Sequence, residues 1–142
     1  MQKLTLKIKR VKDVKLPNYE LEGDAGLDLY AADTVTLQPG EKGAVPTGVQ
    51  MEIPEGHVGL IWDKSGLAIK HGLKTLGGVI DSGYRGEVLV GMINLSKEPY
   101  TFEKNHKVAQ MIIQKKEVVV VQEASALEES QRGARGFGST GK

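Results

Sequence analysis

Residues 78–93, GVIDSGYRGEVLVGMI, combine two apolar runs with a polar corner, which is the pattern of a β-hairpin. Val79 and Ile80 form the first run, and Val88–Ile93 forms the second. The corner carries an acid, Asp81, directly after the first run. This acid can be a turn-forming residue or a general base held by a rigid strand end. The local sequence alone favours the turn.

The rest of the chain shows the same period of two. Apolar residues alternate with polar ones around Leu4–Ile8 and Val49–Ile53, and Val118–Val121 is a further β-rich run. Turn signals separate these runs, and the 18 glycines are spread along the chain. Many short strands predict an all-β sandwich, barrel or jelly roll. Helical pattern is scarce: Ser65–Lys70 predicts one or two turns, and Ser125–Glu128 has capping-box spacing for a short helix.

The composition limits the classes of function. The 142 residues fit one domain, and the formal net charge of +1 gives no global field for a nucleic-acid duplex or an anionic membrane. The absence of cysteine excludes disulfides and thiolate metal sites. We find no signal peptide and no apolar run long enough to cross a bilayer, so we expect a cytoplasmic protein without nucleic-acid or membrane partners.

The last stretch, residues 130–142 (SQRGARGFGSTGK), contains four glycines and one large apolar residue, Phe137. Such a segment buries too little surface to offset its ordering entropy. We therefore divide the chain into a domain at 1–129 and a flexible tail at 130–142. Arg132 and Arg135 could bind phosphate oxygens, and Phe137 could cover a base. The alternative is a solvated tail with no ligand.

Two further segments could bind phosphate or a metal. Lys64, Ser65 and Gly66 open the expected helical turn and could hold an anion, or could be an ordinary helix start with a surface lysine. Asp28 lies in DAGLDL (24–29) and could hold the water shell of Mg²⁺. Turn chemistry around Asp24 is an equally good interpretation of that segment.

Together and in order, five segments resemble the motifs of the trimeric dUTP pyrophosphatase (dUTPase) family. They are DAGLDL (24–29), DKSGLA (63–68), GVIDSGYRGE (78–87), HKVAQMI (106–112) and RGARGFGSTG (132–141). The resemblance implies a jelly-roll or distorted β-barrel subunit with one short helix. It also implies a homotrimer with shared active sites and Mg²⁺-assisted hydrolysis of dUTP to dUMP and pyrophosphate. That reaction supplies dUMP and keeps uracil out of DNA.

The resemblance implies a role for each residue around the hairpin. Asp81 would orient and deprotonate the attacking water, which needs a rigid mount. Tyr84 would pack under the deoxyribose and leave no room for a 2′-hydroxyl. Backbone groups of the hairpin would recognise uracil, and the substrate-binding residues there are Gly78, Val79, Ile80, Tyr84 and Leu89.

The resemblance also implies a set of phosphate-side residues. Asp28 would hold waters on Mg²⁺, and Gln110 would support the phosphate site. Lys64, Ser65 and Gly66 would contact phosphate, Arg132 would clamp the γ-phosphate, Phe137 would stack on uracil, and Gly138 and Ser139 would donate to phosphate.

The chain departs from the family pattern in places that leave alternatives open. Asp63-Lys64 replaces the usual Pro-Arg, so the bidentate fork is lost and a negative charge is added near the phosphates. For Arg85 we expect a structural ion pair. The alternatives are a dCTP deaminase-related enzyme on the same fold and a non-catalytic dUTP-binding regulator.

Overall fold

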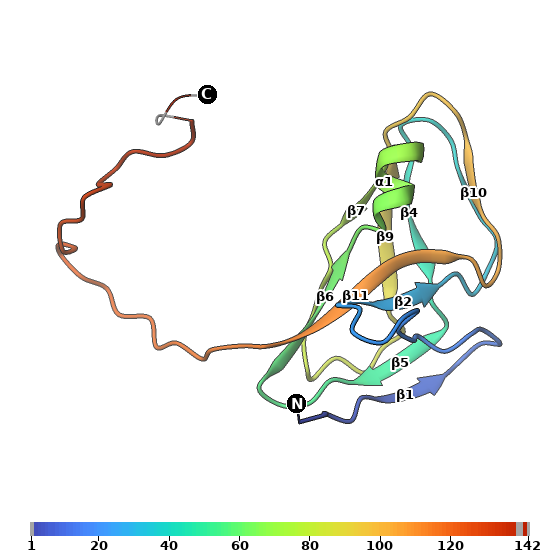
Figure 1. The fold of residues 1–142 in the computed structure, drawn as a ribbon, viewed down its shortest axis with the longest axis horizontal. Coiled ribbons are helices and arrows are strands. Elements are labelled where there is room, and N and C mark those ends of the chain that lie inside the picture. The colour runs from blue at the N-terminus through green and yellow to red at the C-terminus, as the bar shows by residue number, and fades with distance from the viewer. Residues whose placement is uncertain (1, 139–140, 142) are drawn as a thin grey trace.

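A computed structural model describes residues 2–138 and 141, which form a β-rich body followed by an extended C-terminal segment (Figure 1). Among the described residues, the body contains short strands and one helix, α1, which covers the turns predicted at Ser65–Lys70. The elements are β1 (Lys7–Arg10), β2 (Leu27–Tyr30), β3 (Val35–Leu37), β4 (Lys42–Pro46), β5 (Val49–Glu52), β6 (His57–Trp62), α1 (Ser65–His71), β7 (Leu73–Leu76), β8 (Val79–Ile80), β9 (Leu89–Asn94), β10 (Tyr100–Phe102) and β11 (Lys107–Lys115).

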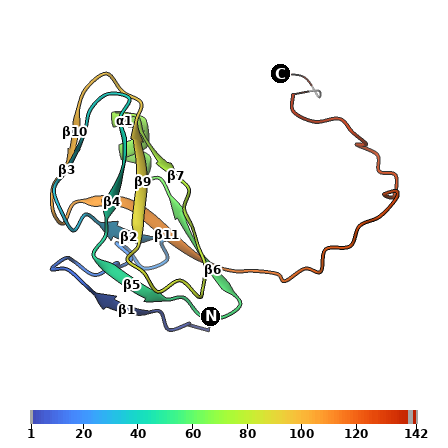
Figure 2. The same cartoon turned by 180° about the vertical axis from the view of Figure 1, so that it is seen from behind.

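The strands pair antiparallel in four small sheets. The largest has the order β2-β11-β6-β8, the next has the order β4-β9-β7, and β1-β5 and β3-β10 are two-stranded. These sheets wrap around a common core without joining into one closed ladder among the described residues (Figures 1 and 2). The expected all-β fold with one short helix is confirmed.

Alternating burial explains why the sequence forms these sheets. In β5, Val49 and Met51 are buried while Glu52 is exposed, and in β9 every second residue is buried. Burial of one face of each strand drives the sheets together, because each large apolar side chain removed from water stabilises the fold by roughly 1.5–3 kcal/mol. The largest fully buried apolar side chains are Tyr30, Phe102, Leu29, Leu73, Met92 and Met111.

Two elements expected from the sequence do not form. Val118–Val121 is not a strand, and its valines are 75–93% exposed. Ser125–Glu128 forms no helix. The backbone of Lys116 still donates to Gly56 O at 2.9 Å, and from there the chain extends away from the body (Figure 1). Valine favours strands only where a partner strand and a packed face exist, and neither is present here. The division into 1–129 and 130–142 stays a prediction.

Across residues 2–138 and 141, no helix combines the length and the apolar character that crossing a membrane would require.

Candidate active site

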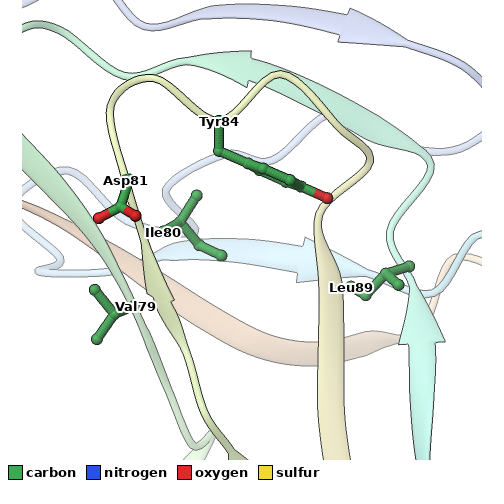
Figure 3. Close-up of a pocket in the computed structure, with 5 residues that line it drawn as sticks. All are labelled: Val79, Ile80, Asp81, Tyr84 and Leu89. Carbon is green, nitrogen blue, oxygen red and sulfur yellow. The ribbon is translucent and has the colours of Figure 1, made fainter.

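A pocket of about 200 Å³ lies under the corner of the predicted hairpin (Figure 3). Its lining residues come from the two arms of the hairpin and from its corner: Val79, Ile80, Asp81, Tyr84 and Leu89. Asp81 lies at the end of β8, and the ring of Tyr84 extends across the space above Ile80 (Figure 3). The structure therefore brings the predicted base and the predicted sugar-contacting ring to one pocket.

The two arms of the predicted hairpin belong to different sheets and do not pair with each other, so the expected β-hairpin ladder is not formed. We keep the name hairpin for this segment of two strands joined by a tight corner. β8 is the edge strand of its sheet and pairs only with β6. On the other arm, the ladder between β7 and β9 ends at the Leu76–Gly91 pair, short of Leu89. Two strand edges with free backbone positions thus border the pocket, and such edges are ready to hydrogen-bond a flat polar ligand.

Gly78 serves the pocket indirectly. It has a φ of 113°, and its carbonyl accepts the Ile61 N–H at 2.8 Å. A Cβ at this position would lie 2.9 Å from Ile61 O, so only glycine fits without a shift. The structure thus places Gly78 beside β6 rather than in the pocket lining, where it fixes the start of β8.

The corner of the hairpin is a tight turn. Tyr84 N–H donates to Asp81 O at 3.1 Å, and the Tyr84 hydroxyl donates to Glu87 O at 2.8 Å. The Asp81 carboxylate is exposed, and it has no ion-pair partner among residues 2–138 and 141. Its lone pairs are therefore free to accept a proton or orient a water molecule.

The base of the hairpin is anchored to the connection between β4 and β5. Thr47 Oγ1 donates to Val88 O at 2.6 Å, and Gly48 N–H donates to Glu87 Oε2 at 2.9 Å. The Lys12 ammonium lies 3.5 Å from Glu87 Oε2. These contacts fix the start of the second arm, which carries Leu89 on the far side of the pocket from Asp81.

A second cluster of polar residues forms where β2, β11 and the end of β6 meet. Gln110 of β11 is paired with Asp28 on one side and with Trp62 on the other. Asp28 is 1% exposed, and its Oδ1 accepts the Lys64 ammonium at 2.7 Å. Lys107 lies 3.4 Å from Oδ2 of the same carboxylate. Three predicted site residues, Asp28, Lys64 and Gln110, are therefore together in this cation-rich cluster.

Gln110 is held in a fixed orientation within the cluster. Its Nε2 donates to Asp63 O at 2.9 Å. Its other amide atom, Oε1, lies so close to Gly26 that a Cβ there would overlap it. Gly26 is thus required for close packing and not for an unusual backbone angle. Asp24 has the turn role, because its Oδ2 accepts Leu21 N–H at 3.0 Å.

The Asp63 side chain lies away from the place where it was expected to act. Its Oδ1 accepts Thr75 N–H at 2.7 Å, and its Oδ2 accepts the Lys74 ammonium at 2.8 Å. Partial burial pushes the pKa of Asp63 up, but the hydrogen bonds from Lys74 and Thr75 outweigh it and lower the pKa. The extra negative charge is thus neutralised within the chain, and Asp63 joins the start of α1 to β7.

Ser65 and Gly66 form the first turn of α1, with Lys64 at its N-cap position. No side chain of the described residues caps this helix start with a hydrogen bond. A Cβ at Gly66 would meet nothing within 4 Å, so this surface is open to a ligand. Lys64, Ser65 and Gly66 therefore extend the cation-rich cluster outward.

The hairpin pocket and the cation-rich cluster of one chain are far apart. Ile80 pairs with Gly59, so Asp81 lies near the beginning of β6, whereas Lys64 follows its end. At about 3.3 Å per residue, roughly 15–20 Å of β6 separates the two positions. In both ribbon views, α1 and the hairpin corner lie at opposite ends of the body (Figures 1 and 2).

The predicted tail residues lie outside both groups. Phe137 is fully exposed, and Arg132 donates to Arg135 O at 2.8 Å while Arg135 donates to Arg132 O at 3.2 Å. Gly138 has a φ of 89°. Ser139 lies outside the described residues. The two arginines therefore hydrogen-bond within the tail segment.

Sequence reasoning missed several residues that support these groups. Lys107 and Asp63 belong to segments that the motifs covered, but their partners Asp28 and Thr75 are distant in the chain. Thr47 and Gly48, which anchor the base of the hairpin, lie outside all five motifs. The motifs had indicated Asp28, Lys64 and Gln110 as phosphate-side residues, but the contact with Lys107 appears only in the structure.

The fold and the two groups define a class: a β-barrel-like protein with a strand-end carboxylate pocket and a separate cluster suited to polyanions. Comparison with known proteins makes this specific. The dUTPase family model matches residues 12–141. The chain belongs to the dUTPase family, as its five motifs predicted.

The sequence relatives cover nearly the whole chain. The deoxyuridine 5′-triphosphate nucleotidohydrolase of Fusobacterium nucleatum is 44% identical over 146 residues, and the match covers 100% of both chains. The protein of the same name from Rhizobium leguminosarum bv. trifolii is 49% identical over 132 residues, covering 89% of this chain and 85% of the relative.

Solved structures agree with the fold. The dUTPase of Staphylococcus bacteriophage 80alpha with dUPNHPP has a TM-score of 0.89 and 31% identity, and the match covers 97% of this chain and 99% of that one. A variant dUTPase of phage phi11 of S. aureus, described with a structural Mg(II) ion, has a TM-score of 0.83 and 27% identity, covering 89% and 100%. The expected jelly-roll subunit is thereby confirmed.

Proposed function

We propose that this protein hydrolyses dUTP to dUMP and pyrophosphate in the cytoplasm, supplying dUMP and keeping uracil out of DNA. The observation that carries the proposal is the hairpin pocket, where Asp81 and Tyr84 flank a space between two free strand edges. Family membership supports the same reaction.

The pocket suits a pyrimidine ring with the hydrogen-bonding pattern of uracil. Backbone N–H and C=O groups of Val79, Ile80 and Leu89 can match the carbonyl and imide groups of uracil and mismatch the amino group of cytosine. The apolar side chains of these residues line the same space and leave little room for a thymine methyl group. The base is thus selected mainly by main-chain groups.

Tyr84 supplies the sugar specificity. Its hydroxyl is already bound to Glu87 O, which fixes the ring over the pocket. A deoxyribose can pack on that face, whereas a 2′-hydroxyl would be desolvated without a partner there. The proposed site therefore disfavours UTP.

The cation-rich cluster is the proposed phosphate side. Lys64 and Lys107 contact the Asp28 carboxylate, and Gln110 pairs with Asp28 across the strands. Ser65 and Gly66 follow Lys64 in the first turn of α1. The lysine charges and the open first turn of α1 suit a triphosphate.

Asp28 also fits the predicted Mg²⁺. Its Oδ2 is buried and lies 3.4 Å from the Lys107 ammonium, but it makes no hydrogen bond among the described residues, so it could accept one from a metal-bound water. The part of the chain that the structure describes contains no group of three or more His, Asp or Glu able to cage an ion, so phosphate oxygens and waters would be the main ligands. When bound, the metal neutralises charge that develops on the phosphates.

The separation of the two groups supports a homotrimer with shared active sites. Roughly 15–20 Å separates Asp81 from Lys64 in one chain. A single nucleotide bound from its uracil to its phosphates is too short to contact both residues. A closed assembly in which one subunit's pocket faces another subunit's cluster solves this mismatch.

The chemical step uses Asp81 as the base. Its carboxylate accepts a proton from a water molecule, and the water oxygen bonds to the α-phosphorus. The bond from that phosphorus to the α,β-bridging oxygen breaks, and pyrophosphate leaves with the electron pair. Lys64 and the backbone N–H groups of Ser65 and Gly66 stabilise the negative charge on the phosphate oxygens.

The tail would close the site after substrate binding. Arg132 would clamp the γ-phosphate, Phe137 would stack on uracil, and Gly138 with Ser139 would donate to phosphate oxygens. The exposed tail and its already clustered arginines support this role.

An activity panel tests the proposal. Pyrophosphate release is measured for dUTP, dCTP, dTTP and UTP with and without Mg²⁺, together with ammonia release from dCTP. We expect turnover of dUTP alone and dependence on Mg²⁺. Ammonia release from dCTP would indicate the deaminase alternative, and tight dUTP binding without hydrolysis would indicate the regulator.

Subunit mixing tests the shared site. An Asp81→Asn variant and a Gln110→Ala variant, each inactive alone, are mixed and allowed to exchange subunits. Restored turnover is expected, because some mixed assemblies combine an intact pocket with an intact cluster. Mixtures that stay inactive despite verified exchange would indicate that each site belongs to a single chain.

A further inference from the structure

Arg85 makes contacts of a different kind from the expected ion pair. Its Nη1 donates to Ser82 O at 2.7 Å and to Tyr84 O at 3.2 Å. Among residues 2–138 and 141, no carboxylate lies within ion-pair distance of its guanidinium. One nitrogen of Arg85 therefore bridges two carbonyls of the hairpin corner.

The bridged carbonyls belong to the turn that carries both pocket residues. Asp81 and Tyr84 are the first and last residues of this turn, joined by the hydrogen bond from Tyr84 N–H to Asp81 O. Between them lies Gly83, and a Cβ added to it would meet no atom within 4 Å. No neighbouring side chain therefore packs against the corner at this position. A Ser-Gly corner without packing loses conformational entropy when it is ordered, and hydrogen bonds must offset that loss.

The outer side of Arg85 lies against a second hollow of about 230 Å³. β1 and β5 form its walls, and Ile8, Met51 and Glu52 are among its lining residues together with Arg85. The arginine thus spans from the corner of the hairpin to the β1–β5 sheet. Its aliphatic stem can pack there while the guanidinium binds the corner.

From this geometry we infer that Arg85 is a positioning residue that holds Asp81 and Tyr84 in their working orientation. It does not touch the pocket, whose lining lacks it. It acts on the reaction rate through Asp81 and on sugar discrimination through Tyr84. The inference rests on the proposed function, since it assigns a role in that same site.

The test compares Arg85→Met with Arg10→Met. Arg10 is the matched control, because its Nη1 also donates to a backbone carbonyl, Val14 O at 3.3 Å, and that carbonyl lies outside the hairpin corner. For Arg85→Met we expect kcat on dUTP to fall about tenfold, since small misplacement of a reacting group is costly. The ratio of kcat/KM for UTP to that for dUTP should rise severalfold. Arg85→Lys should recover part of both.

Hydrogen exchange at the Tyr84 amide provides a readout independent of activity. Without the bridge, the turn opens more often, so exchange should be faster in Arg85→Met than in the wild type and unchanged in Arg10→Met. If the wild type does not hydrolyse dUTP, the proposed function fails and this exchange rate alone decides the role of Arg85. Unchanged exchange, or a loss of activity equal in both variants, would overturn the inference.

Discussion

Asp81 and Asp28 are carboxylates with opposite surroundings. Asp81 is exposed at a strand end with no cation beside it, whereas Asp28 is 1% exposed and lies 2.7 Å from the Lys64 ammonium. Lys107 adds a second positive charge beside Asp28. No lysine or arginine of the described residues forms an ion pair with Asp81. The carboxylate of Asp81 is therefore free to accept a proton, whereas the carboxylate of Asp28 is ion-paired with lysines.

This difference supports the two roles proposed for these carboxylates. A general base must keep an accessible lone pair and reach the substrate's water, which suits Asp81. A buried carboxylate must be paired to be stable, and Asp28 is paired with Lys64 and Lys107. Under the proposed function it would hold these cations and a metal-bound water beside the phosphates. Such a difference in environment can give two carboxylates different roles.

The largest effect should follow from Asp81→Asn. The amide cannot accept the proton of the attacking water, so kcat on dUTP should fall about a thousandfold. The side chain makes no contact that stabilises the fold, so the thermal midpoint should change by less than about 2 °C. Steady-state pyrophosphate release and a thermal melt measure both. An unchanged rate would remove Asp81 as the base.

Removal of residues 131–142 should have the next largest effect. The tail makes no contact with the body among the described residues, so the truncated chain should keep its fold and assembly. Turnover should fall about a hundredfold, since a lid excludes water and completes the site. Sedimentation checks the assembly and pyrophosphate release checks the rate. A truncated protein with full activity would show that Arg132 and Phe137 do not close the site.

Local pattern predicted most of the fold and part of the site. The two strands and the corner at 78–93, the alternating strand at Val49–Ile53 and α1 follow from residues that are neighbours in the chain. The expected pairing of the two arms with each other was wrong, because each arm pairs with strands elsewhere in the fold. The predicted strand at Val118–Val121 does not form, because strand formation also depends on a partner strand, which the sequence of this run does not specify. The contacts of Asp63 with Thr75 and of Asp28 with Lys107 also depend on strand pairing, so no local pattern could reveal them.

Lys64→Met tests the paired carboxylate. The substitution leaves Asp28 buried with only Lys107 nearby, so the free energy of unfolding should fall by about 1–3 kcal/mol. The rate on dUTP should fall about tenfold, because one phosphate-binding charge is lost. Chemical denaturation and pyrophosphate release are the measurements.

The double variant Asp28→Asn with Lys64→Met is the control for that test. It removes the buried charge together with its partner, so stability should return toward the wild type while turnover stays low. If the double variant were as unstable as Lys64→Met, the ion pair would not be the cause of the loss.

The smallest effect should follow from Asp63→Asn, which breaks the ion pair with Lys74 but keeps an acceptor for Thr75 N–H. Lys74 is half exposed, so the loss should be about 1 kcal/mol or less. The folded-state pKa of Asp63 is below the usual value, so its contribution to stability is present above the unfolded pKa of about 3.9. It disappears as the pH falls through the lowered pKa.

The gap in thermal midpoint between the wild type and Asp63→Asn should therefore stay constant from about pH 8 to about pH 5 and close below about pH 4. Thermal melts across this range measure it, with Asp33→Asn as the control for an exposed aspartate paired with a lysine at 3.1 Å. A gap that widened in acid would mean that the ionised form of Asp63 does not stabilise the start of α1. The orientation of Gln110, whose amide donates to Asp63 O, would then depend on the backbone alone.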